Sequence, residues 1–148
     1  VLVLPTDYFL LYIPLTQKSS IEFTFEIEKK GTYRIDAYMV YSVFSGVFQP
    51  YIDGKPIGPP IDFSLPGYDY SMLYLDLHEL TEGKHTLRFE GLEQTPKYMR
   101  TLLPKVYGLG IAGISLLRLE DMEGYRATLK RLVPSAFPDE KPQQQQEQ

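Results

Sequence analysis

Residues 21–28 read IEFTFEIE, and this stretch decides the fold class. Isoleucine or phenylalanine alternates with glutamate or threonine at every second position. Successive side chains of a β-strand point to opposite faces, whereas a helix would scatter these residues around its circumference. The stretch therefore predicts a β-strand with one buried face and one face in water.

A second alternating segment follows at residues 32–41, after a turn at residues 29–31 that ends in glycine. On this segment Arg34, Asp36 and Tyr38 share one face, and the more apolar residues between them share the other. Two alternating segments that are joined by a short glycine turn are typical of an antiparallel hairpin. We therefore expect these two strands to pair with each other.

Further stretches of strand character lie on the C-terminal side, separated by turn residues. They are residues 47–52, 55–57, 61–63, 72–77, 85–90 and 107–119. Asp53-Gly54 is the clearest hairpin signal, because a tight two-residue turn needs a positive φ at both central positions. Short strands with a turn about every ten residues predict an all-β fold, an antiparallel β-sandwich or barrel rather than a βαβ fold.

The strand-rich domain at residues 21–119 is flanked by two segments of different character. Residues 1–20 are an expected N-terminal lead-in, and because Val1 is not methionine, a signal peptide or another domain could precede them. Residues 120–148 are a C-terminal extension, with a short helix expected at residues 122–132. The Pro- and Gln-rich end is expected to be disordered, because it cannot bury enough apolar surface to order itself.

Composition narrows the class of protein. The 148 residues carry a formal charge of −4, which argues against nucleic acid as the main partner because such proteins present a basic face. No apolar run reaches the roughly 18 residues that a membrane-spanning helix needs. The chain has no cysteine and no tryptophan but 12 tyrosines, a residue that suits both strands and binding surfaces.

Four segments resemble, in their order and spacing, parts of jelly-roll carbohydrate-binding modules. They are GTYRI at residues 31–35, YIDGK at residues 51–55, LTEGKHTLRF at residues 80–89 and IAGISL at residues 111–116. Through them the chain resembles the galactose-binding-domain-like superfamily, which includes accessory domains of exported glycoside hydrolases. The resemblance implies a jelly-roll sandwich that binds carbohydrate without catalysis, as one domain of a larger exported protein.

A sugar-binding site needs flat aromatic faces for the C–H side of a pyranose and planar polar groups for its hydroxyls. Three connections supply such residues and could converge at one end of the sandwich. The candidate ligand-binding residues are Tyr41, Phe44 and Phe48 after the second strand, Tyr68, Asp69 and Tyr70 in a loop expected at residues 64–70, and Tyr98, Arg100 and Tyr107 in or beside the long connection before the last strand. The alternative for any single ring is that it covers a sheet edge or corner.

Two alternatives stay open. The chain could be a structural or docking subunit whose tyrosine-rich surface and terminal extensions contact another protein, since interface cores favour aromatic residues.

Asp62, Asp69 and Asp76 are candidate calcium ligands, and no other cofactor is expected. An enzyme is not expected, because the sequence has no G-x-S-x-G elbow and because His78 and His85 are not spaced as metal ligands.

Overall fold

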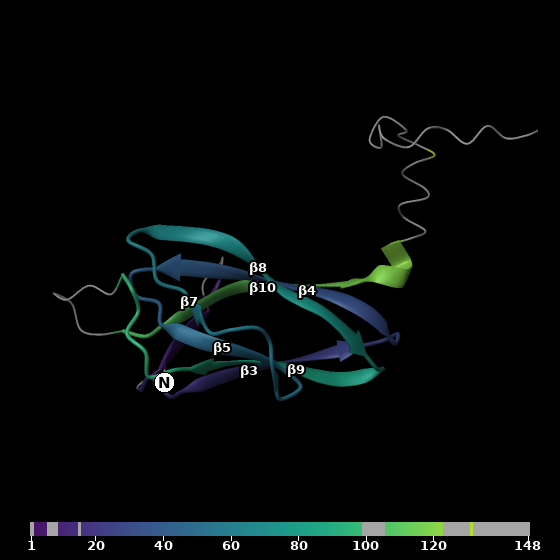
Figure 1. Ribbon diagram of the computed structural model, residues 1–148, viewed down its shortest axis with the longest axis horizontal. Coiled ribbons are helices and arrows are strands. Elements are labelled where there is room, and N and C mark those ends of the chain that lie inside the picture. The colour runs from purple at the N-terminus through teal and green to yellow at the C-terminus, as the bar shows by residue number, and fades with distance from the viewer. Residues whose placement is uncertain (1, 6–8, 15, 99–105, 123–130, 132–148) are drawn as a thin grey trace, which may run out of the picture.

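The structure, a computed structural model, describes residues 2–5, 9–14, 16–98, 106–122 and 131. It shows two antiparallel five-stranded sheets that pack face to face (Figure 1). This architecture confirms the all-β sandwich that the two-residue periodicity predicted.

Ten strands make up the two sheets. They are β1 (Leu2–Pro5), β2 (Leu10–Ile13), β3 (Ser20–Ile27), β4 (Gly31–Ser42), β5 (Val47–Ile52), β6 (Lys55–Pro56), β7 (Ile61–Asp62), β8 (Tyr68–Leu80), β9 (Gly83–Gly91) and β10 (Leu109–Arg118). Sheet A has the order β1-β2-β10-β4-β8, and sheet B has the order β3-β9-β5-β6 with β7 also paired to β5. Figure 1 shows β4, β8 and β10 in one layer and β3, β5 and β9 in the other.

The expected hairpin between the first two alternating segments is wrong. β3 pairs with β9 in sheet B, whereas β4 pairs with β8 and β10 in sheet A. The turn between β3 and β4 therefore carries the chain from one layer to the other. Periodicity shows which face of a strand is buried, but it is the same whether the next strand joins the same sheet or the opposite one.

The predicted turn at Asp53-Gly54 is confirmed. Ile52 lies opposite Lys55 in the β5–β6 pair, and the two turn residues have φ angles of 48° and 77°. Positive φ at both positions matches the right-handed twist of the flanking strands, and aspartate and glycine tolerate it best.

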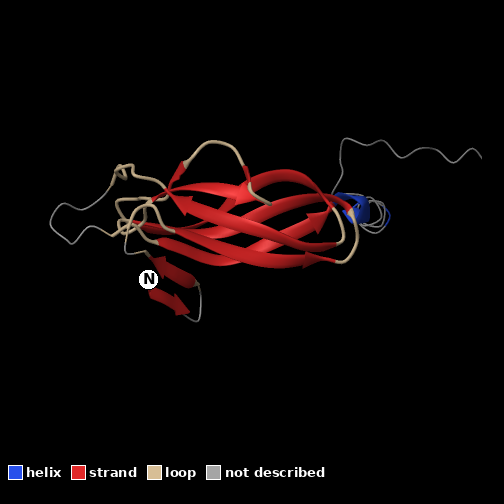
Figure 2. Cartoon of the chain, turned by 90° about the horizontal axis from the view of Figure 1, so that it is seen from below, coloured by secondary structure: helices blue, strands red, loops and turns tan. Residues whose placement is uncertain are grey.

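The N-terminal segment contributes strands to sheet A. β1 and β2 pair with each other, and β2 continues the sheet by pairing with Leu109–Ile111 of β10. Figure 2 shows this hairpin beside the end of the sandwich. The expected lead-in thus includes two strands, each only four residues long. Such short apolar runs lack the extended alternation that identified β3 and β4.

The expected loop at residues 64–70 is shorter than predicted, because β8 begins at Tyr68 directly after Pro66 and Gly67. Pro66 and Gly67 favour a turn, and the predicted loop also contained the aromatic residues that follow them. In the structure these residues pair with the end of β4, Ser42 opposite Tyr68 and Val40 opposite Tyr70. This register gives the two tyrosines a sheet face instead of a loop tip.

The core lies between the inner faces of the two sheets. Phe63, which follows β7, is fully buried at its centre. The centroid of its ring lies 5.2 Å from that of Tyr41 in sheet A, and 6.2 Å and 6.3 Å from those of Phe48 and Phe89 in sheet B. Aromatic pairs at such spacings attract one another, so Phe63 joins the two layers.

A helical turn begins at Leu119, directly after β10, and is described as far as Met122. Most of the helix predicted at residues 122–132 therefore lies outside the described residues, as does the Pro- and Gln-rich end. Within the described part of the chain, no helix has the length and apolar character needed to cross a bilayer.

Candidate functional site

The outer face of sheet A carries a row of exposed aromatic side chains. Alternate residues of β8 share one face, and their partners in β4 have side chains on the same side. We call this surface the tyrosine face and define it by Tyr38 of β4 and by Tyr68, Tyr70, Met72 and Tyr74 of β8. Each of these five residues is between 44% and 58% exposed, although large apolar side chains are normally buried. An exposed row of this kind marks a candidate contact surface.

An ion pair lies beside the row. Arg34 donates from Nε to Asp36 Oδ2 over 2.9 Å and from Nη2 to Oδ1 over 3.3 Å. Asp36 is only 6% exposed and lies opposite Tyr74, whose ring centroid is 4.9 Å from the Arg34 guanidinium carbon. The hydrogen bond with Asp36, together with its charge, raises the pKa of Arg34 above the usual value. The pair thus holds planar donors and acceptors at a fixed position next to an aromatic ring.

At the other end of the row, three rings cluster. The centroid of Phe9 lies 5.8 Å from that of Tyr70 and 6.5 Å from that of Tyr68, and the two tyrosine rings meet edge to face at 5.4 Å. Gly110 of β10 lies beneath Phe9, where a Cβ atom would come within 2.7 Å of the Val40 Cβ. The glycine thus leaves room for the Val40 side chain, which lies opposite it on β4.

An apolar hollow of about 610 Å³ adjoins this cluster. Its lining includes Phe9, Leu11, Val40, Phe44, Tyr68 and Val106. The hydroxyls of Ser42 and Ser45 supply polar atoms in the same wall and lie 3.1 Å apart. The hollow is continuous with the tyrosine face because Tyr68 belongs to both.

The structure brings together some of the candidate residues from the sequence. Phe44 and Tyr68 line the same hollow, and Tyr70 contacts Tyr68. Tyr41 and Asp69 lie opposite each other on the other side of sheet A. Burial raises the pKa of Tyr41, and the charge of Asp69 adds to this effect.

Phe48, Tyr98 and Tyr107 do not belong to the tyrosine face. Phe48 is 1% exposed and belongs to the core, so it has no face to offer a ligand. Tyr98 is exposed, and its backbone N–H donates to Ser64 Oγ over 3.1 Å. Tyr107 is only partly exposed. Arg100 lies outside the described residues.

Sequence reasoning missed Arg34, Asp36, Tyr38, Met72 and Tyr74 as site residues. The signal was present for three of them, because alternation in residues 32–41 places Arg34, Asp36 and Tyr38 on the same strand face. An aromatic ring beside an ion pair on a strand face is as informative as an aromatic ring in a loop.

The three candidate calcium ligands lie in separate environments. Asp62 accepts backbone N–H groups from Ser64 and Lys97 at 2.9 Å and 2.8 Å, and so fastens a loop. Asp76 has a left-handed φ of 68° in an irregularity of β8, and its Oδ1 accepts the Leu77 N–H at 2.8 Å. Within the described residues, no group of three acidic, histidine or cysteine side chains is arranged to hold a metal ion.

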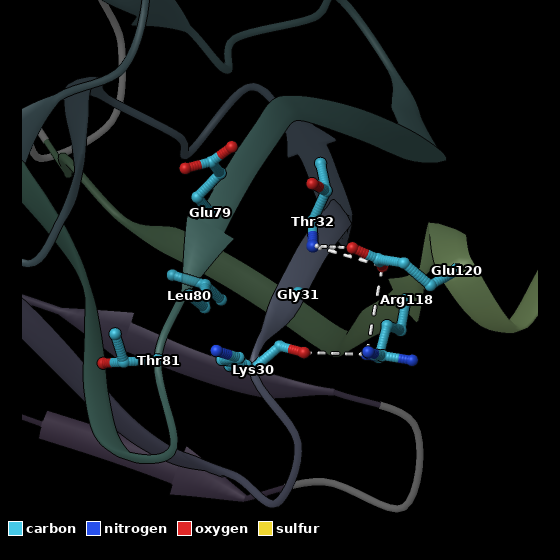
Figure 3. A pocket seen from close by; sticks show the side chains of 8 residues that line it. All are labelled: Lys30, Gly31, Thr32, Glu79, Leu80, Thr81, Arg118 and Glu120. Carbon is cyan, nitrogen blue, oxygen red and sulfur yellow. Dashed lines mark hydrogen bonds and ion pairs between the residues drawn. The ribbon is translucent and has the colours of Figure 1, made fainter.

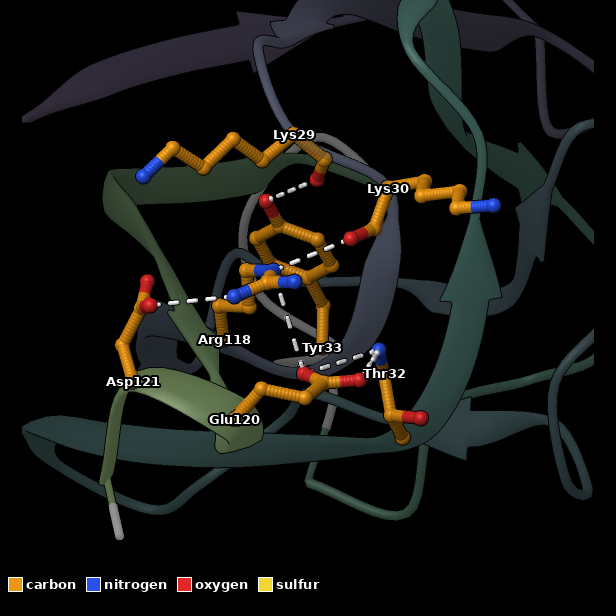
Figure 4. Close-up of polar contacts among 7 residues, drawn as sticks. All are labelled: Lys29, Lys30, Thr32, Tyr33, Arg118, Glu120 and Asp121. Atoms are coloured by element: carbon orange, nitrogen blue, oxygen red, sulfur yellow. Dashed lines mark hydrogen bonds and ion pairs between the residues drawn. The ribbon is translucent and has the colours of Figure 1, made fainter. Parts of the chain in front are cut away.

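A second hollow, of about 430 Å³, lies where the C-terminal helical turn meets the sandwich (Figure 3). The backbone N–H of Thr32 donates to the Glu120 carboxylate at 2.9 Å and 3.2 Å, which lowers the pKa of Glu120. Arg118 donates to the Lys30 carbonyl and to Asp121, both at 3.0 Å (Figure 4). These polar groups pair with one another, so this hollow is a structural junction between the start of β4 and the segment where β10 passes into the helical turn.

Comparison with known proteins supports the fold. No protein-family model matches the chain, and no curated protein matches it in sequence. Part of a xanthan lyase from Paenibacillus superposes with a TM-score of 0.60 at 19% identity, over 74% of this chain and 10% of that one. Two family 35 carbohydrate-binding modules are also similar. The module from Clostridium thermocellum has a TM-score of 0.44 at 15% sequence identity, over 73% of this chain and 76% of that one. The module from Paenibacillus barcinonensis has a TM-score of 0.43 at 17% sequence identity, over 79% of this chain and 86% of that one.

This chain therefore spans only a tenth of the lyase that it resembles. At such low identity the similarity concerns the fold alone. The superposition on the lyase extends over most of the β-sandwich that the two sheets form. The chain thus has the antiparallel β-sandwich fold that its alternating strands predicted.

Proposed function

We propose that this chain is a non-catalytic module that binds carbohydrate through the tyrosine face of sheet A. The observation that carries the proposal is the exposed row on β8 and β4 beside the Arg34–Asp36 pair. Aromatic rings pack against the apolar C–H face of a sugar, while guanidinium and carboxylate groups bond to its hydroxyls. Both kinds of group lie within one strand pair here.

The proposal excludes catalysis at this face. Glycoside hydrolysis needs two carboxyl groups on opposite sides of the scissile bond, one of which must donate a proton. Asp36 is nearly buried and both of its carboxylate oxygens accept hydrogen bonds from Arg34, so we do not expect it to act as the proton donor. We further propose that the chain acts as one domain of a larger exported protein, a role that fits its match to a small part of the lyase.

Calorimetric titration of the intact chain with a panel of soluble oligosaccharides tests this function. We expect at least one neutral glycan to bind, and Tyr74→Ala or Tyr70→Ala to weaken it about tenfold or more, as loss of an aromatic anchor usually does. Tyr51→Ala is the matched control, because Tyr51 pairs with Arg88 in sheet B and stacks on its guanidinium. If all three variants fold and lower the glycan affinity equally, the tyrosine face is not the binding site.

A docking module is the second candidate, and one observation favours it. Met72 interrupts the tyrosines of β8, and the adjoining hollow is largely apolar, which suits a protein side chain better than a sugar hydroxyl. Sedimentation of the chain at micromolar concentration gives a first test. Self-association that Met72→Asp abolishes would support docking through this face, whereas a strict monomer that binds glycans would exclude self-docking.

A further inference from the structure

We infer that the tyrosine face takes an uncharged glycan, which it holds along a stretch of several sugar units rather than by one terminal sugar. The inference rests on the proposed function and adds the charge and the length of the ligand. Two independent features of the face support it: the balance of charge around Tyr74 and the extent of the aromatic row.

The charge balance disfavours acidic sugars. Arg34 is the cation beside Tyr74, and Asp36 already occupies its planar fork with two hydrogen bonds. A second carboxylate, Asp76, lies close by, with its Oδ1 3.4 Å from the Tyr74 hydroxyl. One guanidinium and two carboxylates leave a net negative charge at this end of the row. A glycan carboxylate would be repelled there, or would have to displace Asp36 from Arg34.

Uncharged hydroxyls meet no such obstacle. Two hydrogen bonds to Asp36 leave other N–H groups of Arg34 free, because a guanidinium carries five N–H donors. The Arg34 side chain is 41% exposed, so those donors can reach a ligand. Sugar hydroxyls both donate and accept, and they can therefore bond to the ion pair without breaking it.

The extent of the row fits several sugars. From Tyr68 to Tyr74 the strand advances six residues, which corresponds to about 20 Å at roughly 3.4 Å per residue. Tyr38 lies opposite Met72 on the next strand, about 5 Å away, so the surface is two strands wide at its middle. A single sugar would cover only part of such a surface. An extended chain that lies parallel to β8 would contact the tyrosines at both ends.

Titration of the full chain with glycans of different charge and length tests the inference. The probes are glucose, mannose, their β-1,4-linked disaccharides and hexasaccharides, and hexagalacturonate. We expect a neutral hexasaccharide to bind at least about tenfold more tightly than its monosaccharide and than hexagalacturonate. Its affinity should stay constant between about 0.05 and 0.5 M NaCl, since no net charge is paired in the complex.

Two substitutions sharpen the charge argument. Asp36→Asn removes the carboxylate that occupies Arg34 with little change in shape, and we expect it to strengthen hexagalacturonate binding several-fold at low salt. Asp69→Asn changes the net charge of the chain equally, but Asp69 lies opposite Tyr41 on the other side of sheet A. Asp69→Asn should leave the affinities for the neutral hexasaccharide and for hexagalacturonate unchanged. An equal gain in the two variants would trace the effect to overall charge and overturn the role of Asp36.

The outcomes separate this inference from the proposed function. If hexagalacturonate binds more tightly than every neutral probe and Tyr74→Ala abolishes its binding, the face is a glycan site and the inference on charge is wrong. If a monosaccharide binds as tightly as its hexasaccharide, with the same loss in Tyr74→Ala, the inference on length is wrong. If no carbohydrate binds, neutral or acidic, the proposed function itself is overturned.

Discussion

His85 of β9 links its strand to the turn at Asp53 and to the turn that contains Thr81. Its Nδ1 lies 2.6 Å from Asp53 Oδ2, and its Nε2 lies 2.8 Å from the Thr81 carbonyl oxygen. Both partners are acceptors, so only the protonated imidazolium satisfies both contacts. The hydrogen bond to Asp53 raises the pKa of His85 against the opposing effect of burial. Burial would raise the pKa of Asp53, but hydrogen bonds from His85 and from the Thr86 N–H outweigh it and lower the pKa.

These directions predict how stability depends on pH. The folded state binds the His85 proton more tightly than the unfolded chain does, so the contribution is complete below the usual histidine pKa of about 6.5. It is lost as the pH rises through the higher pKa of the folded state. We therefore expect the melting temperature to fall as the pH rises above about 6.5. Asp53→Asn keeps a residue that tolerates the left-handed turn and should flatten the fall, and a wild-type melting temperature that is constant above pH 6.5 would contradict this account.

A second prediction at the residue scale concerns the effect of a side chain at Gly91 on stability. Gly91 ends β9, and a Cβ atom there would overlap the backbone carbonyl oxygen of Gln17 and lie 3.0 Å from that of Ser19. Because backbone atoms cannot rotate away as a side chain can, Gly91→Ala should lower the free energy of unfolding by about 2 kcal/mol or more. Gly67→Ala is the control, since nothing lies within 4 Å of its added Cβ and its φ is not positive. Urea denaturation should show no more than about 0.5 kcal/mol of loss for Gly67→Ala.

At the scale of elements, one aromatic side chain joins the two sheets. Phe63 is fully buried and contacts rings of both layers. We expect Phe63→Ala to lower the free energy of unfolding by about 3–5 kcal/mol, because it leaves a cavity between the sheets. Phe44→Ala removes a side chain of the same type that is 46% exposed, and it should cost far less. Similar denaturation midpoints for the two variants would show that Phe63 does not hold the layers together.

The sequence predicts the strands of this protein better than their partners. β3, β9 and the turn after β5 follow from alternation and from the Asp53-Gly54 signal, since these depend on local geometry. The pairing of β3 with β9 depends on packing between segments some sixty residues apart, which a local pattern does not contain. The short strands β1 and β2 were not predicted for the same reason, because β2 is placed by its pairing with the distant β10, and β1 by its pairing with β2.

The candidate site was predictable only in part. Tyr68 and Tyr70 were chosen for their residue type, and the structure places them on a sheet face where sequence had suggested a loop. Tyr74 and the Arg34–Asp36 pair become neighbours only through the register of β4 with β8. That register includes an irregularity between Arg34 and Asp36, which periodicity alone would not reveal.

At the scale of the whole molecule, the two outer faces of the sandwich differ. Sheet A presents the tyrosine face, whereas sheet B presents charged side chains such as those of Glu22, Glu26 and Arg88 along β3 and β9. Among the described residues, none of the large apolar side chains that are exposed belongs to β3, β5 or β9. This asymmetry supports the proposal that sheet A carries the binding surface.

The most direct test of the central claim is to map backbone amide chemical shifts by NMR during titration with a glycan that binds. The account predicts that the largest changes fall on β4 and β8, around Tyr38 and Tyr74, with little change along β3. Changes concentrated on sheet B, or at the end of the sandwich near Tyr98, would contradict it.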